Sequence, residues 1–221
     1  AWAVPGAGSV HHRYRVAARM SGFDASRIQD LLGALDAKLV AMGARADIYL
    51  VGGAAIALSF DDTRATRDLD AVFVPTEEVR QAAAAVAADE DLLVDWLNDA
   101  AKGFVPPGVD QAQRVVYESE HLRVCTASAE HLLAMKVAAS RVERDRSDLE
   151  LLVRQLGLTS SDQALDLARA CLGPGYPIPP RAMYLLGEIF ENENRRQSRP
   201  APTSVTPLPI QTQGPSGVKH G

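Results

Sequence analysis

Two aspartates separated by a single residue are the first candidates for chemistry in this sequence. Asp68 and Asp70 flank Leu69 at the start of an apolar run that Pro75 closes. If this run is a strand, side chains at positions i and i+2 point to the same face, so the two carboxylates lie close together. Such a pair repels and is commonly held by Mg²⁺, which takes oxygen ligands and bridges carboxylates to substrate phosphates. The alternative is a solvated strand end in which Asp68 is a turn residue.

A pair of glycines upstream is a candidate for binding phosphate. Gly52 and Gly53 follow the apolar run 48–51 and precede residues 54–60, which read as a short helix. Glycines at a strand-to-helix turn leave backbone N–H groups accessible, and a helix N-terminus attracts negative charge. Taken alone, the pattern also fits an ordinary tight turn. Followed by an aspartate pair on the next strand, it favours a nucleotide site.

Lys136 is the third candidate, because it lies in an apolar stripe of the sequence made by Leu132, Leu133, Val137 and Ala139. A lysine is rarely buried without a partner. The alternative is a lysine whose aliphatic stem covers the core while its ammonium group reaches water. Beside an acidic pair and a glycine turn, we expect Lys136 to hold a nucleotide phosphate and to stabilise the charge that develops as pyrophosphate leaves.

The elements that must position these residues are predicted from apolar periodicity and from turn and cap residues. Ser26 and Gln29 form a capping box that opens a helix ending at Gly43. Strands are predicted at 48–51 and 69–74, a hairpin at 115–117 and 122–125, and further helices at 76–88, 91–101, 128–144, 146–156, 160–172 and 180–194. Strands come first and helices last, which predicts an α/β or α+β fold with a helical C-terminal half.

Length and composition predict one domain with extensions at both ends. The chain has 221 residues, and the segment from Arg195 onward contains five prolines and no apolar period. We therefore expect a flexible N-terminal arm over 1–23, a core over 24–126, a helical part of the same domain over 127–194, and a disordered tail over 195–221.

Charge and composition exclude several classes of protein. The net charge is −5, and the two ends carry seven cationic residues and no acid, so residues 24–194 carry −12. A segment this acidic disfavours general nucleic-acid binding, and no DNA partner is expected. No apolar run is long enough to span a membrane. The two cysteines, Cys125 and Cys171, form no zinc or disulfide pattern, which predicts a reducing, cytoplasmic location.

Two motifs resemble a known superfamily. The first is Gly52-Gly53, then a helix, then Arg64-x-Thr66-x-Asp68-x-Asp70. The second is a helix carrying Leu132-Leu133-x-x-Lys136, followed by Arg144-Asp145-x-x-Asp148. Together they resemble the nucleotidyltransferase superfamily of the DNA polymerase β type, in particular the AbiEii and MenT branch of toxins from bacterial toxin–antitoxin pairs. The resemblance spans residues 47–156. The sequence departs from it at Gly53, where many members have Ser, and at Arg144, where Lys is common.

The resemblance implies a small mixed sheet flanked by helices and an NTP-dependent, pyrophosphate-releasing transfer. Asp68 and Asp70 would hold Mg²⁺ or Mn²⁺, and Lys136 would contact a phosphate oxygen. A third carboxylate would be Asp148, which we favour, or Asp145. The remaining nucleotide contacts would be made by Gly52, Gly53, Arg64, Thr66 and Arg144. The resemblance further implies transfer RNA as acceptor and a cognate antitoxin protein as partner.

Two other functions remain open. An antibiotic nucleotidyltransferase of the aminoglycoside type shares the same core, and the acidic segment 24–194 fits a cationic drug. A catalytically inactive module on the same fold would bind NTP without transferring a nucleotide. Labelled NTPs offered with total RNA or with aminoglycosides distinguish the three functions.

Overall fold

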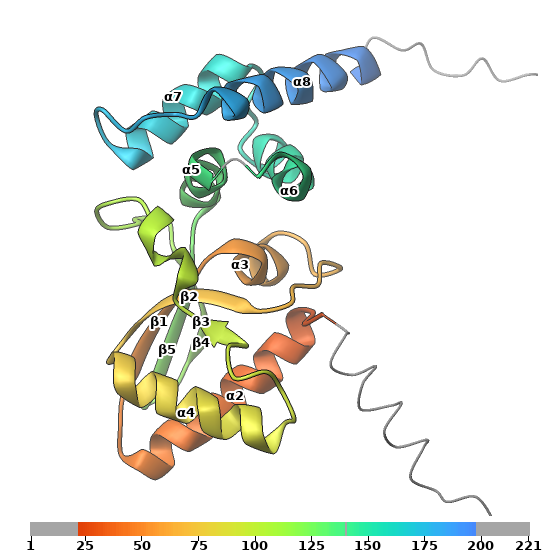
Figure 1. Ribbon diagram of the computed structural model, residues 1–221. Coiled ribbons are helices and arrows are strands. Elements are labelled where there is room, and N and C mark those ends of the chain that lie inside the picture. Colours follow the sequence, from red (N-terminus) through yellow and green to blue (C-terminus); the bar gives the residue numbers. More distant parts are fainter. Residues whose placement is uncertain (1–21, 140, 198–221) are drawn as a thin grey trace, which may run out of the picture.

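The computed structural model describes residues 22–139 and 141–197. Five strands form one mixed sheet in the order β3-β2-β1-β5-β4, in which β1 runs antiparallel to β2 and parallel to β5. The predicted fold class, a mixed sheet flanked by helices and followed by a helical C-terminal half, is confirmed (Figure 1). The elements are α2 (Ala25–Met42), β1 (Ala46–Leu50), α3 (Gly52–Ser59), β2 (Leu69–Val74), α4 (Thr76–Asp89), β3 (Leu97–Asn98), the 3₁₀ helix η1 (Ala100–Phe104), β4 (Arg114–Glu118), β5 (Leu122–Thr126), α5 (Ala129–Ala139), α6 (Val142–Gln155), α7 (Ser161–Leu172) and α8 (Pro180–Gln197).

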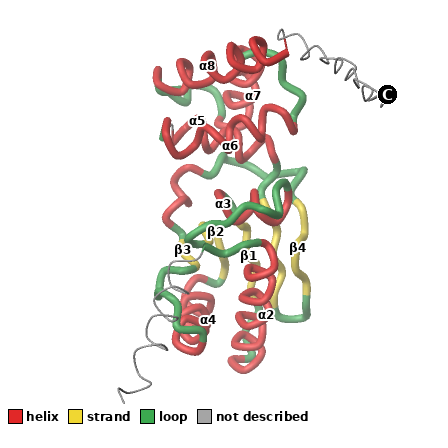
Figure 2. The backbone as a smooth tube through the Cα atoms, turned by 90° about the vertical axis from the view of Figure 1, so that its right-hand side faces the viewer, coloured by secondary structure: helices red, strands yellow, loops and turns green. Residues whose placement is uncertain are grey.

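Helix α3 lies between the two halves of the molecule. Helices α2 and α4 occupy one end and α5 to α8 the other, with α3 in the middle (Figures 1 and 2). Ala54 and Ala57 of α3 belong to the core cluster of the sheet, α2 and α4. Ala55 and Ile56 belong to the cluster of the C-terminal helices. Because α3 is apolar all round, it is buried by both clusters and joins them.

Helix α2 begins earlier than the predicted capping box. The Asp24 carboxylate accepts a hydrogen bond from the Arg27 N–H at 2.8 Å and caps the helix. Ser26 therefore lies within the first turn and is exposed, and the Gln29 side chain donates to the Val116 carbonyl. The capping-box prediction is wrong because Asp24, two residues upstream, is itself a strong cap and occupies the N-cap position.

The alternation of buried residues in β1 and β2 fixes where the aspartates point. Ile48, Leu50, Ala71 and Phe73 are buried in the cluster of α2 and α4. Asp70 alternates with Leu69 and Ala71, so its side chain lies on the opposite face of the sheet. The predicted strand 69–74 is confirmed, and Asp68 lies in the bend just before it.

The predicted helix over 91–101 is wrong. Residues 97–98 form β3, which pairs parallel to β2 with Asn98 opposite Asp70, and η1 follows. Trp96 is buried, and its indole N–H donates to the Ala83 carbonyl at 3.0 Å. The apolar spacing of this segment imitates a helix, but pairing with β2 and burial of the indole outweigh the local preference.

The predicted helix over 128–144 is divided in two. Ser128 does cap it, because its hydroxyl accepts from the His131 N–H, but α5 ends at Ala139 and α6 begins at Val142. Asp110 anchors the start of α5 to the sheet by accepting hydrogen bonds from the Ser128 N–H at 2.8 Å and the Tyr49 hydroxyl at 2.6 Å. Burial opposes ionisation of Asp110, but these hydrogen bonds outweigh it and lower its pKa.

The chain ends extend beyond the described residues. Of the predicted arm over 1–23, residues 1–21 lie outside them, and Phe23 is buried and pairs with Thr66 in an isolated bridge. Helix α8 continues to Gln197, and the rest of the predicted tail lies outside the described residues. None of the described helices is both long and apolar enough to cross a membrane.

The cap of α2 is testable. Asp24→Ala is expected to lower the free energy of unfolding by about 1 kcal/mol, because the Arg27 N–H loses its acceptor. Ser26→Ala, in the first turn of the same helix, is the control and should change stability little. Urea unfolding followed by circular dichroism measures both. An equal loss of unfolding free energy in the two variants would instead support Ser26 as the N-cap of the helix.

Candidate active site

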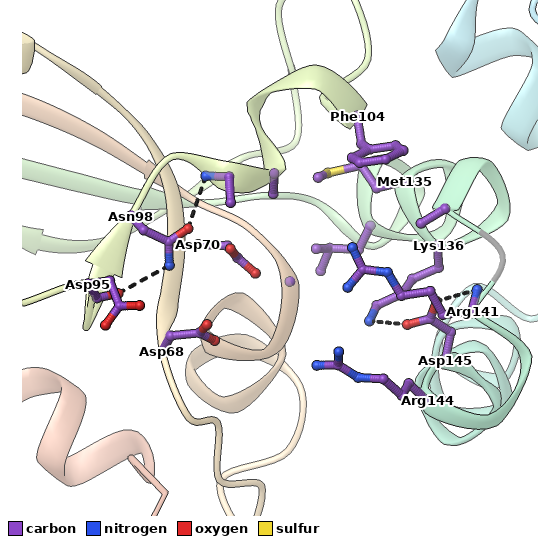
Figure 3. A pocket seen from close by; sticks show the side chains of 15 residues that line it. Asp68, Asp70, Asp95, Asn98, Phe104, Met135, Lys136, Arg141, Arg144 and Asp145 are labelled. Carbon is purple, nitrogen blue, oxygen red and sulfur yellow. Dashed lines mark hydrogen bonds and ion pairs between the residues drawn. The ribbon is translucent and has the colours of Figure 1, made fainter. Parts of the chain in front are cut away.

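A cavity of about 450 Å³ opens between the start of β2 and the helices α5 and α6 (Figure 3). Its size lies in the range of small-molecule and cofactor sites. Three aspartates and Asn98 come from the sheet side, and the three cationic side chains come from the helical side together with Asp145. The lining consists of Gly52, Asp68, Asp70, Asp95, Asn98, Ala100, Ala101, Phe104, Leu132, Met135, Lys136, Ala139, Arg141, Arg144 and Asp145.

Gly52 brings the start of α3 against the acidic pair. Its φ of +61° lies in the left-handed region that favours glycine. A Cβ at this position would lie 3.2 Å from an Asp70 carboxylate oxygen. The absence of a side chain therefore lets the backbone approach Asp70 closely, and the Val51 N–H donates to the Asp70 carbonyl at 2.9 Å.

The electrostatic surroundings of Asp70 are divided between the two sides of the cavity. Burial raises the pKa of its carboxyl group, and the neighbouring Asp68 carboxylate raises it further. The positive charges of Arg141, Lys136 and Arg144 lower the pKa of Asp70, but by less than burial and Asp68 raise it. The ionised pair is thus under-compensated by the protein, which is the setting in which a bound cation stabilises two carboxylates.

Lys136 is held by two carboxylates of α6. Its Nζ lies 2.7 Å from Asp145 Oδ1 and 2.8 Å from Asp148 Oδ2. Asp145 also accepts a hydrogen bond from the Arg141 N–H at 3.0 Å, across the junction of α5 and α6. These contacts fix the ammonium group at the wall of the cavity, so Lys136 is a paired lysine with a defined position.

Asp148 belongs to this network but does not line the cavity. Its side chain is 1% exposed, and Oδ1 lies 2.5 Å from Arg64 Nη2 in an ion pair that lacks hydrogen-bond geometry. Helix α6 begins at Val142, so Asp148 lies within the helix and not at its start. The structure brings both candidate third carboxylates to Lys136, and of the two only Asp145 faces the cavity.

Three residues of the first motif make contacts within the chain. Arg64 pairs with Asp148 and donates to the Ser147 hydroxyl at 3.4 Å. The Thr66 hydroxyl donates to the Asp68 carbonyl at 3.1 Å. A Cβ on Gly53 would lie 2.6 Å from Thr66 Oγ1, so this glycine permits α3 to pack against the loop that carries Asp68. These three residues lie behind the acidic pair and are not among the lining residues.

Arg144, selected from the sequence, and Arg141 both extend their guanidinium groups into the cavity (Figure 3). Neither forms an ion pair with a carboxylate of another described side chain. Two guanidinium groups so placed, beside an ammonium group, have the charge and geometry that suit an anion such as phosphate.

Asp95, Asn98, Phe104 and Met135 line the cavity but carry no local signal in the sequence. The first three lie in or beside the segment 91–101, which was predicted as a helix and so was not connected to the aspartate pair. Met135 precedes Lys136 and was covered by the apolar stripe. Among the described residues, no group of three or more His, Cys, Asp or Glu side chains is arranged to hold a metal ion. A metal site here would therefore have the carboxylates of Asp68 and Asp70 as its acidic ligands, with other oxygens supplied by phosphate or water.

Asp70→Asn tests the electrostatics of the acidic pair. Because the folded-state pKa of Asp70 lies above its ordinary value near 3.8, the ionised carboxylate destabilises the metal-free fold once the pH exceeds that raised pKa. The variant should have a higher Tm than the wild type at pH 7 in EDTA, and the difference should vanish as the pH falls below 3.8. Asp62→Asn, in the exposed part of the same loop, is the control for loss of one charge. A lower Tm of Asp70→Asn at pH 7 would contradict this account.

Comparison with known proteins places the chain in a family. Residues 29–161, more than half of the sequence, match the family described as "Nucleotidyltransferase of unknown function (DUF6036)". The match includes the aspartate pair, Lys136 and both candidate third carboxylates. Searches of curated proteins and of solved structures found no match. The chain therefore belongs to the DUF6036 family of nucleotidyltransferases.

Proposed function

We propose that this protein is a metal-dependent nucleotidyltransferase that transfers a nucleoside monophosphate from an NTP to an acceptor hydroxyl and releases pyrophosphate. The observation that carries the proposal is the cavity, which places an aspartate pair opposite three cationic side chains. This division of charge suits a metal–triphosphate complex, since the metal needs anionic oxygens and the phosphates need cations. Family membership supports the same class of reaction.

Asp68 and Asp70 are proposed to hold Mg²⁺ or Mn²⁺. The chemistry of the donors fits these ions, because both ligands are carboxylates and both line the cavity. The raised pKa of Asp70 supports this assignment, since burial and the neighbouring Asp68 carboxylate both disfavour the ionised form, and a bound cation would offset both effects. When bound, the ion supplies positive charge that polarises the phosphoryl group and screens the developing negative charge.

Lys136, Arg141 and Arg144 are proposed to bind the triphosphate, with the backbone of Gly52 at the start of α3 beside it. Asp145 orients Lys136 from the cavity wall, and Asp148 orients it from behind. Gly53, Arg64 and Thr66, expected from the resemblance to contact the nucleotide, are proposed instead to position the loop that carries Asp68, because their contacts are made within the chain.

The reaction is an in-line displacement at the α-phosphorus. The acceptor hydroxyl gives its proton to solvent as its oxygen forms a bond to the α-phosphorus, and the bond from that phosphorus to the pyrophosphate oxygen breaks. Negative charge accumulates on the departing pyrophosphate, where Lys136 and the two arginines stabilise it. The chain contributes mainly by positioning and by fixed charge, as is usual for phosphoryl transfer.

The acceptor and the biological role are proposed from the resemblance alone. We propose transfer RNA as acceptor, a toxin role, and a cognate antitoxin protein that neutralises it. A cytoplasmic location is part of the proposal, in keeping with Cys125 and Cys171 being free thiols.

A specific observation favours antibiotic transfer as the second candidate. Asp95 is exposed at the cavity beside the aspartate pair, and an additional carboxylate there would attract a cationic acceptor. Incubation with labelled NTPs and either total RNA or aminoglycosides distinguishes the two. An inactive module that only binds NTP would transfer label neither to RNA nor to aminoglycosides.

Removal of either proposed metal ligand should abolish transfer without unfolding the protein. For Asp68→Ala and Asp70→Ala we expect a loss of roughly a thousandfold or more in the rate of label incorporation, because several kcal/mol of transition-state stabilisation is lost. Asp62→Ala is the matched control and should keep wild-type turnover. Thermal melting confirms folding. A folded Asp70→Ala protein with near-normal turnover would refute the metal assignment.

The two carboxylates that hold Lys136 should differ in their effects. Asp148→Asn leaves Arg64 and Lys136 short of one buried charge, so we expect about 3 kcal/mol lower stability and a near-complete loss of transfer. Asp145→Asn removes the charge of one of the two carboxylates that contact Lys136 and should be milder in both respects. Urea unfolding and single-turnover assays measure the two effects. If Asp145→Asn is inactive and Asp148→Asn is active, then Asp145, and not Asp148, is the carboxylate on which transfer depends.

A further inference from the structure

One part of the cavity lining carries no charge. Phe104, at the end of η1, and Met135, on α5, lie together on the side of the cavity away from Arg144, with Lys136 and Arg141 between (Figure 3). The remaining apolar lining residues are Ala100, Ala101, Leu132 and Ala139. We call Phe104 and Met135 with these four residues the apolar wall.

We propose that the apolar wall binds the nucleobase of the NTP by stacking, and that it selects purines over pyrimidines without distinguishing adenine from guanine. This inference rests on the proposed function, because it needs the triphosphate to lie at Lys136, Arg141 and Arg144.

The apolar wall lies where the base would be placed when the triphosphate lies at the cationic side chains. A triphosphate is held where cations converge, and the aspartate pair faces those cations from the sheet side. The base is the remaining large, planar and weakly polar part of the nucleotide. In a cavity of about 450 Å³ it is placed against the lining that offers an aromatic ring and a thioether.

The packing of Phe104 supports a ligand-facing role. The ring is half-buried: it packs against the core cluster of the C-terminal helices and also lines the cavity. Met135 is 7% exposed and comes from the helix that carries Lys136. One surface of the ring is thus supported by the protein, while the cavity side is free to contact a base.

The selectivity for purines follows from the composition of the apolar wall. All six of its side chains are apolar, so none of them can form hydrogen bonds that read the edge of a base. Affinity then follows stacking area, which is larger for purines than for pyrimidines. Adenine and guanine differ in their edge groups and have nearly equal stacking area, so the wall treats them alike.

Equilibrium binding of ATP, GTP, CTP and UTP with MgCl₂ to the full chain, by calorimetry, tests the inference. Phe104→Ala should weaken ATP and GTP binding by about tenfold, in line with the loss of one stacked base. Inorganic tripolyphosphate, which has no base, should bind the variant and the wild type equally. Val105→Ala is the matched control, since Val105 packs on the same core cluster but does not line this cavity. Phe104→Leu, which keeps apolar volume but loses the ring, serves if the alanine variant fails to fold.

The outcomes separate this inference from the proposed function. Tighter binding of purines by the wild type, with ATP and GTP within about threefold of each other, supports the wall as a stacking surface. Unchanged NTP affinity in folded Phe104 variants, tighter pyrimidine binding, or a clear preference between ATP and GTP would overturn it while leaving tripolyphosphate binding intact. Failure of the wild type to bind tripolyphosphate or any NTP would overturn the proposed function together with the inference.

Discussion

The placement of the site depends on one buried carboxylate. Asp148 is 1% exposed and is held by Arg64 from the loop before β2 and by Lys136 from α5. Burial of a carboxylate without cationic partners greatly lowers the stability of the fold, so the fold depends on both contacts. They tie the loop that carries Asp68 to the helix that carries Lys136. The acidic and cationic sides of the cavity are therefore held opposite each other by the same network.

The two glycines impose a second constraint, in the form of close packing. Gly52 has no side chain where Asp70 approaches, and Gly53 has none where the Thr66 side chain packs. Thr66 in turn bonds to the Asp68 carbonyl and pairs with Phe23 through the backbone. The glycine pair therefore allows α3 to pack closely against Asp70 and against the loop that carries Asp68. Of the two glycines, Gly52 lines the cavity and Gly53 does not.

The chain is acidic, yet one side of the cavity is lined by three cations, and the reason is local. The segment 24–194 is strongly acidic, yet the junction of α5 and α6 directs Lys136, Arg141 and Arg144 into one cavity. Their field acts at short range, because surface charges farther away are screened by solvent and salt. An acidic protein can therefore bind a triphosphate, and the exposed acidic surface disfavours non-specific binding to nucleic acid.

The sequence by itself determined the strand that carries Asp70, with Asp68 directly before it, the glycine pair that follows β1, and the start of the helix that carries Lys136, because apolar period and turn residues are local signals. It also selected most of the charged cavity residues. Only the tertiary structure decided that 97–98 pair with β2, which brings Asn98 and Phe104 to the cavity. It likewise decided that Asp148 pairs with Arg64 behind the cavity, while Asp145 faces it. A two-residue strand and an ion pair between distant segments have no local signal, since both form only when long-range packing brings the partners together.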